Sequence, residues 1–168
     1  RHLLALGHRT IACFIGRLDF ETHKQGIEGY TQALTEAGIP VDKALIQVSK
    51  DEDGYEMCSR MQALDIPFTA VFCANTVIQF GVLQRLRESG AAVPHDVSLI
   101  GSGWSELVKV SVPQLTTMYV HPTQKAMLVT RLIDIIEGRA ATPELKLISE
   151  FVLHEGETVS LCRDQLSQ

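Results

Sequence analysis

The sequence lacks any apolar run close to the roughly 20 residues that a membrane-spanning helix needs, and it carries no secretory or lipidation signal. It also lacks a basic stripe, because Lys and Arg are scattered along the 168 residues and the net charge is −5. We therefore expect no membrane partner and no surface for duplex DNA within these residues. Any contact with DNA would have to come from another segment.

Paired cysteines are missing as well. The four cysteines lie far apart and form no CxxC motif. Two of them, Cys13 and Cys73, fall in the middle of strand-like runs, where a reduced cysteine behaves as a small hydrophobe. This pattern predicts free thiols and a cytoplasmic location.

Catalytic and metal-binding motifs are absent. The run Gly101-Ser-Gly103 lacks the third glycine of a dinucleotide fingerprint, since Glu106 stands there, and no GxxxxGK[ST] loop exists. Ser102 is not in a GxSxG elbow, and His154-Glu155 is not followed by a second histidine at HExxH spacing. No Cys, His and carboxylate cluster has metal-ligand spacing. The sequence predicts neither an enzyme nor a bound metal or cofactor.

Short apolar runs alternate with amphipathic segments along the whole chain. From Thr69 to Gly103 the order is strand, helix, strand, which is a βαβ crossover and implies a parallel sheet. The sequence therefore predicts a single α/β domain. The expected strands are Thr10–Ile15, Ala44–Val48, Thr69–Cys73, Val97–Gly101, Leu115–Val120 and Lys146–Leu153. The expected helices are Arg1–Gly7, Thr22–Ala37, Asp51–Leu64, Thr76–Ser89 and Thr123–Glu137, followed by a poorly ordered tail, Arg163–Gln168.

One of these helices is unusually apolar. The Thr123–Glu137 segment carries apolar residues over much more than the usual stripe. A helix with so wide an apolar arc is normally buried on more than one side.

Polar side chains follow four of the predicted strands, and the carboxyl ends of parallel strands share one edge, where ligands bind. The candidates are Arg17, Asp19, Thr22, Ser49, Lys50, Asn75, Ser102, Gly103 and Trp104. Bidentate donors and acceptors pair with vicinal hydroxyls or a carboxylate, and an indole face covers the C–H side of a sugar ring. The group therefore suits a polyhydroxylated ligand, and its two cations favour a sugar acid.

Each candidate has a purely structural alternative. Asn75 is equally placed to cap the helix that follows it, and both roles can coexist. Asp19 could cap the helix near Thr22, Trp104 could plug its loop, and Lys50 could be a solvated surface residue. The histidines at positions 2, 8, 23, 95 and 154 are interpreted as surface or turn residues.

Several segments resemble the lac/gal repressor family of bacterial transcription regulators. The opening RHLLALGHRTIA is similar to its HLLxLGHRxIA segment, and GIEGYTQALTEAG is similar to RxxGYxxALxxAG. TAVFCAN, AVPHDVSLIG and QLTT resemble TAxFxxND, VPxDVSxxGF and PxLTT. The segments occur in the family's order and cover nearly the whole chain.

The resemblance implies a type I periplasmic-binding-protein-like fold with effector held between two lobes. Residues 1–117 would form the C-terminal lobe, a flavodoxin-like three-layer sandwich, with residues 150–160 as its return strand. Residues 118–149 would belong to the other lobe, and 161–168 would be a tail. The family also implies a helix-turn-helix headpiece upstream that binds operator DNA, and a homodimer to which Phe80 and Leu83 contribute.

Departures from the family pattern concern its ligand residues. Gly26 stands where the family usually has a ligand-clamping Arg, and Thr76 replaces the Asp that follows Asn75. Gly103 and Trp104 replace acidic residues that often hold sugar hydroxyls. Arg17-Leu-Asp19 with Thr22 and the glycine-rich loop are similar to gluconate-repressor-like members, which again favours a sugar acid. The resemblance makes Asn75 the firmest effector residue, followed by Arg17 and Asp19.

Two functional hypotheses follow. The first is the effector-binding and dimerisation region of a lac/gal-type regulator that senses a sugar or sugar acid. The alternative is a periplasmic sugar-binding protein of a transporter, which would share the fold and the pocket. A signal peptide and a monomeric state would favour the alternative, whereas the LGHR opening and the free cysteines favour the regulator.

Overall fold

A six-stranded sheet forms the centre of the molecule. The computed structural model describes residues 1–104, 106–139 and 150–163. The strand order is β2-β1-β3-β4-β5-β6; β1 to β5 run parallel, as predicted, and β6 is antiparallel to β5. The strands are β1 (Ile11–Ile15), β2 (Ile46–Val48), β3 (Ala70–Cys73), β4 (Ser98–Ser102), β5 (Thr116–Val120) and β6 (Phe151–His154). The first half of the last predicted strand, 146–149, lies outside the described residues.

Helices cover both faces of this sheet. They are α1 (His2–Ala5), α2 (Glu21–Glu36), α3 (Gly54–Ala63), α4 (Thr76–Glu88), α5 (Glu106–Val110) and α6 (Pro122–Ile136), with a 3-10 turn at Lys43–Leu45. The predicted Asp51–Leu64 helix begins only at Gly54, because the Asp53 carboxylate accepts from the Glu56 N–H at 3.0 Å and caps it. The short α5 is an element that the sequence analysis did not predict.

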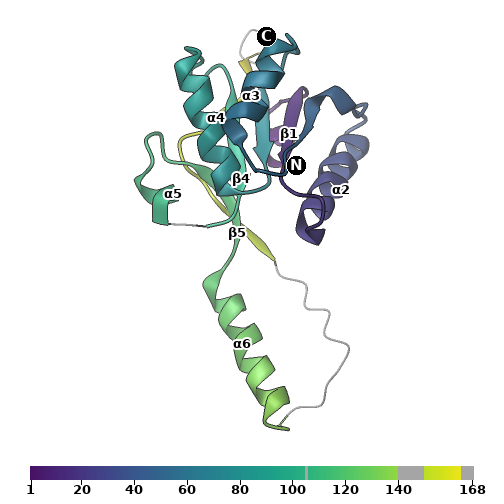
Figure 1. Cartoon of the computed structure of the whole chain (residues 1–168), viewed down its shortest axis with the longest axis vertical. Coiled ribbons are helices and arrows are strands. Elements are labelled where there is room, and N and C mark those ends of the chain that lie inside the picture. The colour runs from purple at the N-terminus through teal and green to yellow at the C-terminus, as the bar shows by residue number, and fades with distance from the viewer. Residues whose placement is uncertain (105, 140–149, 164–168) are drawn as a thin grey trace.

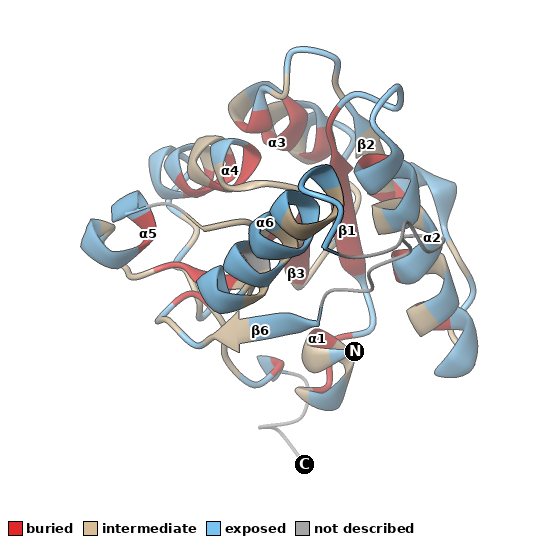
Figure 2. Ribbon diagram, turned by 90° about the horizontal axis from the view of Figure 1, so that it is seen from below, coloured by how far each residue is buried: buried red, intermediate tan, exposed pale blue. Residues whose placement is uncertain are grey.

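Alternate residues of β1 point into two separate cores. Ala12 and Phe14 pack with α3 and α4, whereas Ile11, Cys13 and Ile15 pack with α2 and α1. All five residues of β1 are buried, and Figure 2 shows this strand in red between the two helical layers. This is the predicted three-layer α/β sandwich, with α3 and α4 on one side of β1 and α2 on the other (Figure 1).

Two glycines let α3 and α4 approach each other very closely. A Cβ atom at Gly54 would lie 2.0 Å from the carbonyl oxygen of Ile78, and one at Gly81 would lie 2.6 Å from the backbone nitrogen of Tyr55. The contact is therefore backbone against backbone. The contact holds α4 in a fixed position against α3, and with α4 it holds Asn75, the residue that precedes this helix.

Two histidines were placed wrongly by the sequence analysis. His8 is 2% exposed and His23 is 9% exposed, so neither is a surface residue. The Nε2 atom of His8 donates to the Ser160 carbonyl at 3.1 Å, which ties the C-terminal segment to the start of β1. Burial lowers the pKa of His8 below its ordinary value, because desolvation penalises the charged imidazolium.

Helix α6 projects away from the sandwich, as Figure 1 shows. Its apolar side chains are largely exposed, including Met127 at 71% and Ile136 at 74%. The expectation that this helix is buried on more than one side is therefore not met within the chain, because no other described element packs along it. None of the described helices combines the length and the apolar character that crossing a membrane requires.

The predicted tail falls mostly outside the described residues. Of Arg163–Gln168 only Arg163 is described, and its guanidinium forms an ion pair with Asp96 at 2.6 Å.

The glycine contact between α3 and α4 generates a stability prediction. Gly54→Ala should destabilise the protein by about 1–3 kcal/mol, because backbone must move to admit the new methyl group. Gly29→Ala is the matched control, since a Cβ there meets nothing within 4 Å. In the middle of α2 it should stabilise by roughly 0.5–1 kcal/mol. Urea unfolding followed by circular dichroism measures both, and equal effects of the two substitutions would contradict the close contact.

Candidate functional site

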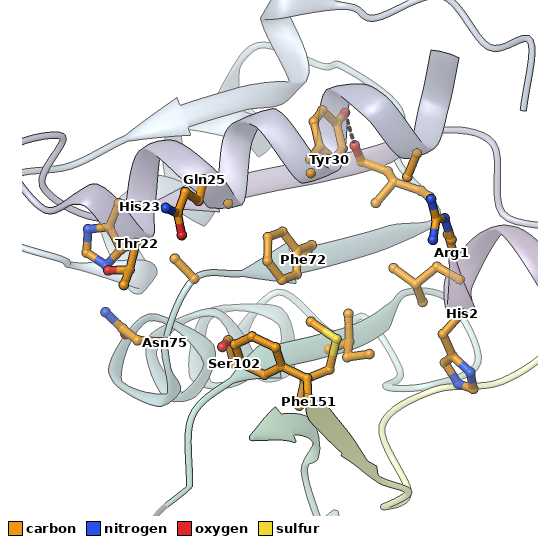
Figure 3. A pocket seen from close by; sticks show the side chains of 18 of the residues that line it. Arg1, His2, Thr22, His23, Gln25, Tyr30, Phe72, Asn75, Ser102 and Phe151 are labelled. Carbon is orange, nitrogen blue, oxygen red and sulfur yellow. Dashed lines mark hydrogen bonds between the residues drawn. The ribbon is translucent and has the colours of Figure 1, made fainter. Parts of the chain in front are cut away.

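A cavity of about 630 Å³ opens on the α2 face of the sheet. Its floor and sides are apolar and come from the sheet, α1, α2 and β6; they include Ile11, Phe72, Ile100 and Met118 from strands and Leu34 from α2. At the carboxyl ends of the strands its lining becomes polar. Figure 3 shows Thr22, His23 and Gln25 from α2 facing Asn75 and Ser102 across this end. The cavity thus offers hydrogen-bonding groups at the carboxyl edge of the sheet, while Arg1 and His2 line its opposite end (Figure 3).

Asn75 is the best-anchored polar group of this end. Its Oδ1 accepts from the Ile78 N–H at 2.9 Å and so caps α4, while its Nδ2 donates to Glu52 Oε2 at 2.9 Å. The capping alternative is therefore confirmed. Because the amide retains one free N–H and one free lone pair, capping leaves Asn75 able to bind a ligand as well.

Glu52 and His23 complete a polar cluster that the sequence analysis missed. Glu52 Oε1 lies 3.8 Å from His23 Nε2, and the side chains of His23 and Glu52 are 11% and 26% exposed. His23 Nδ1 donates to the Arg17 carbonyl at 2.8 Å. Glu52 lies in the loop just before α3. Its contact with Asn75 depends on the conformation of the loop before α3, which no residue spacing reveals.

Arg17 and Asp19 form an ion pair with each other in the loop between β1 and α2. Arg17 Nε donates to Asp19 Oδ1 at 3.1 Å, and the two side chains are 49% and 60% exposed. The hydrogen bond from Arg17 lowers the pKa of Asp19, and the same bond raises the pKa of Arg17. Neither side chain belongs to the cavity lining. Asp19 does not cap α2, whose N-cap residue is Phe20 and has no capping side-chain bond.

Gly103 belongs to the cavity through its backbone. Its φ of +105° is a conformation that side-chain-bearing residues rarely adopt. Its N–H donates to the Met118 carbonyl at 2.7 Å, and its carbonyl accepts from Thr117 Oγ1 at 2.8 Å. The loop after β4 is thereby fastened to β5.

Trp104 packs away from the cavity. Its ring centroid lies 4.6 Å from that of Tyr119 and 5.0 Å from that of His154, with Lys109 Nζ 5.4 Å from the ring. Neighbouring residues of a strand point to opposite faces, so Tyr119 faces away from the cavity that Met118 lines. The contacts of Trp104 are those of the loop-plugging alternative, and its role in effector binding stays a prediction.

The remaining predicted residues are divided between cavity and surface. Thr22 lines the cavity beside Asn75, and Gly26 leaves it open where the family usually has an Arg. Lys50 is exposed and lies outside the lining. The structure thus brings Thr22, Asn75 and Gly103 together in the lining of one cavity. The other four predicted residues, Arg17, Asp19, Lys50 and Trp104, do not line it.

The two predicted dimer residues differ in accessibility. Leu83 is 5% exposed and packs within the core between α3, α4 and the sheet, whereas Phe80 is half-buried against that core. Of the two, Phe80 is the more available to a partner.

Within the described ranges, no three His, Cys, Asp or Glu side chains are placed to hold a metal ion. All four cysteines are free and buried. Burial raises the pKa of the Cys58 thiol to about 11, so this thiol is a packing group rather than a nucleophile.

Comparison with known proteins identifies the family. The family model described as "Periplasmic binding protein-like domain" matches residues 1–159. Among curated proteins, the HTH-type transcriptional regulator DegA of Bacillus subtilis is 38% identical over 120 residues, which are 70% of this chain and 35% of that protein. The HTH-type transcriptional repressor PurR of Pasteurella multocida is 32% identical over 143 residues, covering 83% of this chain and 43% of that protein.

The solved structures that match this chain are also those of transcriptional regulators. The Escherichia coli transcriptional repressor ascG superposes with a TM-score of 0.84 at 27% identity, covering 95% of this chain and 58% of that one. The transcriptional regulator CelR in its cellobiose complex superposes with a TM-score of 0.83 at 28% identity, covering 94% and 49%.

The chain therefore spans less than two thirds of the proteins it resembles. Its relatives are transcriptional regulators and not enzymes, as the sequence analysis expected. The protein belongs to the periplasmic binding protein-like domain family, in the form found in lac/gal-type transcriptional regulators.

Proposed function

We propose that this chain is the effector-binding and dimerisation region of a transcriptional regulator that senses a sugar or a sugar acid. The observation that carries the proposal is the cavity whose polar end joins Thr22, Asn75 and Gly103 at the carboxyl edge of a parallel sheet. This is the edge at which open α/β sheets bind ligands. Membership of a regulator family supplies the biological context.

The chemistry of the edge supports a polyhydroxylated ligand. Thr22 and Ser102 offer hydroxyls, and Asn75 offers both a donor and an acceptor, which suit vicinal hydroxyl groups. The exposed Arg17–Asp19 pair stands beyond the cavity, where it can exchange its internal hydrogen bonds for bonds to a ligand. One structural relative was solved in complex with cellobiose, and another, from Escherichia coli, carries the description sugar-binding.

DNA binding is assigned to a helix-turn-helix headpiece outside these residues. The net charge of −5 and the scattered Lys and Arg residues favour DNA binding by another segment and effector binding by this one. Effector binding would change the closure of two lobes and shift operator affinity, with a coupling on the order of 1–3 kcal/mol. The preceding ~150 residues of the gene product should encode this motif, and its absence there would defeat the regulator proposal.

The exposed apolar side chains of α6 support the proposal that this helix belongs to a second lobe. Residues 118–149 would belong to that lobe, whose other residues would cover Met127, Leu132 and Ile136, whereas residues 1–117 and 150–160 would form the lobe that carries the cavity. An apolar face of this kind marks an interaction surface.

A second exposed apolar surface supports a homodimer. Leu107, Val110 and Val112, in and just after α5, are 60%, 72% and 77% exposed, and Arg87 Nη1 of α4 donates to the Val112 carbonyl at 3.1 Å. Figures 1 and 2 both draw α5 beside α4, the helix that carries Phe80. We call Phe80, Leu107, Val110 and Val112 the α4–α5 surface, and assign dimerisation to it.

The transport alternative receives less support. The relatives named above are transcriptional regulators, and none carries the name of a transport protein. The four free cysteines fit a regulator that works in the reducing cytoplasm.

Effector binding is tested by two substitutions at the edge. Asn75→Ala and Arg17→Ala should each weaken binding of the effector at least about tenfold, because each removes hydrogen bonds to it. Asn75→Ser separates binding from stability, since serine also caps a helix but lacks the amide. A thermal-shift screen of the intact protein against sugars and sugar acids finds the effector, and calorimetry measures the affinities. Unchanged affinity in all three variants would remove these residues from the site.

Dimerisation is tested on the α4–α5 surface. Val112→Glu and Leu107→Glu should each weaken the dimer at least about tenfold, because a charge would be buried against apolar partner side chains. Leu161→Glu is the control, since Leu161 is 50% exposed and its neighbour Cys162 donates its N–H to the carbonyl of Leu6, the residue after α1, and not to α4 or α5. Sedimentation equilibrium gives the dissociation constants. Equal dimer strength in the α5 variants and the wild type would assign the interface elsewhere.

A further inference from the structure

Glu52 forms a hydrogen bond with the side-chain amide of Asn75, the group that the proposed effector would also bind. Its Oε2 accepts from Asn75 Nδ2 at 2.9 Å, and its Oε1 lies 3.8 Å from His23 Nε2. Gly16, just after β1, makes room for this arrangement. A Cβ there would lie 2.4 Å from Glu52 Oε1 and 2.5 Å from His23 Cε1.

Local structure does not account for this position. Glu52 has a φ of 55°, a left-handed conformation that is uncommon for residues other than Gly, Asn and Asp. The cap of α3 is supplied by Asp53 and not by Glu52. A strained residue whose side chain makes no local bond, yet contacts the ligand-facing amide of another strand end, points to a role at the site.

The hydrogen-bonding capacity left at Asn75 decides what can bind beside Glu52. One Nδ2 proton is taken by Glu52, and one Oδ1 lone pair is taken by the Ile78 N–H. A ligand hydroxyl can accept the second Nδ2 proton and donate its own proton to the Glu52 carboxylate. A ligand carboxylate can only accept, and at the same amide it would stand next to a second negative charge.

Two basic groups lie near Glu52: His23 contacts it, and the charge of Glu52 contributes to raising the pKa of Arg17. His23 is the single basic side chain within 4 Å of it in the described part of the chain. His23 Nδ1 donates to the Arg17 carbonyl, so the ring can give a second N–H to Glu52 only in its protonated form. The Arg17 guanidinium is itself paired with Asp19. Glu52 is not part of the cavity lining, and it reaches the cavity end through its hydrogen bond to Asn75, which is.

We propose that Glu52 is a specificity-determining residue, which selects neutral polyhydroxylated ligands against acidic ones at Asn75. The inference rests on the proposed effector site and narrows its ligand class. It reverses the preference for a sugar acid that the cations Arg17 and Lys50 suggested from the sequence, since neither cation lines the cavity, whereas Glu52 is bonded to the Asn75 amide that does.

The test compares matched pairs of ligands on the intact protein. The probes are D-glucitol with D-gluconate, D-glucose with D-glucuronate, and D-galactose with D-galacturonate, so that each pair differs in a carboxylate. The ratio of acid to neutral affinity, measured by calorimetry, should rise at least about tenfold in Glu52→Gln. Glu52→Asn, which suits the left-handed backbone, should act in the same direction. Asp51→Asn removes an exposed charge one residue away and should leave the ratio unchanged.

The possible outcomes distinguish a failure of the proposed effector site from a failure of the specificity role of Glu52. If a neutral probe binds but the ratio stays constant in both Glu52 variants, the specificity role is overturned while the effector site stands. If both members of a pair weaken equally, Glu52 only positions Asn75, and the specificity role is again overturned. If none of the six probes binds to the wild type or to any variant, the sugar-binding function fails, and the inference fails with it.

Discussion

Parallel pairing of β1 with β2 and β3, and of β4 with β3 and β5, decides where the polar groups of this protein gather. Because five strands end at the same edge, the segments after β1, β3 and β4 meet there, although they are far apart in sequence. Both faces of the sheet must then be covered by helices, which explains the two cores on either side of β1. The position of Asn75 follows from this arrangement together with the close α3–α4 contact, since Asn75 both ends the β3 segment and caps α4.

The two faces of the sheet are covered unequally, and the difference creates the site. On one face α3 and α4 pack backbone to backbone at Gly54 and Gly81 and leave a continuous core. On the other, α2 and the single turn of α1 leave an apolar trough over Phe72, Ile100 and Met118 that ends at the polar edge. The apolar length of the trough and the hydrogen-bonding end fit the general form of a small-molecule site. Two groups of exposed apolar residues lie on α6 and on the α4–α5 surface, where the proposed lobe and partner would cover them.

Repetitive features of the chain were predictable from the sequence, and features that depend on side-chain direction in loops were not. Apolar runs bounded by Gly and Pro gave β1, β3, β4 and β5, and the parallel sheet followed from the spacing between them. The position of Asn75 could be predicted because a residue between a parallel strand and the helix that follows it must lie at the carboxyl edge of the sheet. The antiparallel direction of β6 and the outward packing of Trp104 could not, since both depend on contacts with Tyr119 and other residues distant in sequence. Glu52 escaped notice because its contact requires a left-handed backbone in an unremarkable acidic run.

Hydrogen–deuterium exchange of the intact protein, with and without the effector found by screening, tests most directly whether the strand ends form one site. The account predicts slower exchange together in the segments that follow β1, β2, β3 and β4, near residues 16–23, 49–53, 74–76 and 102–104, with little change at the opposite edge around residues 91–97. Protection confined to the opposite edge, or to only one of the four segments, would contradict a shared effector site at the carboxyl edge.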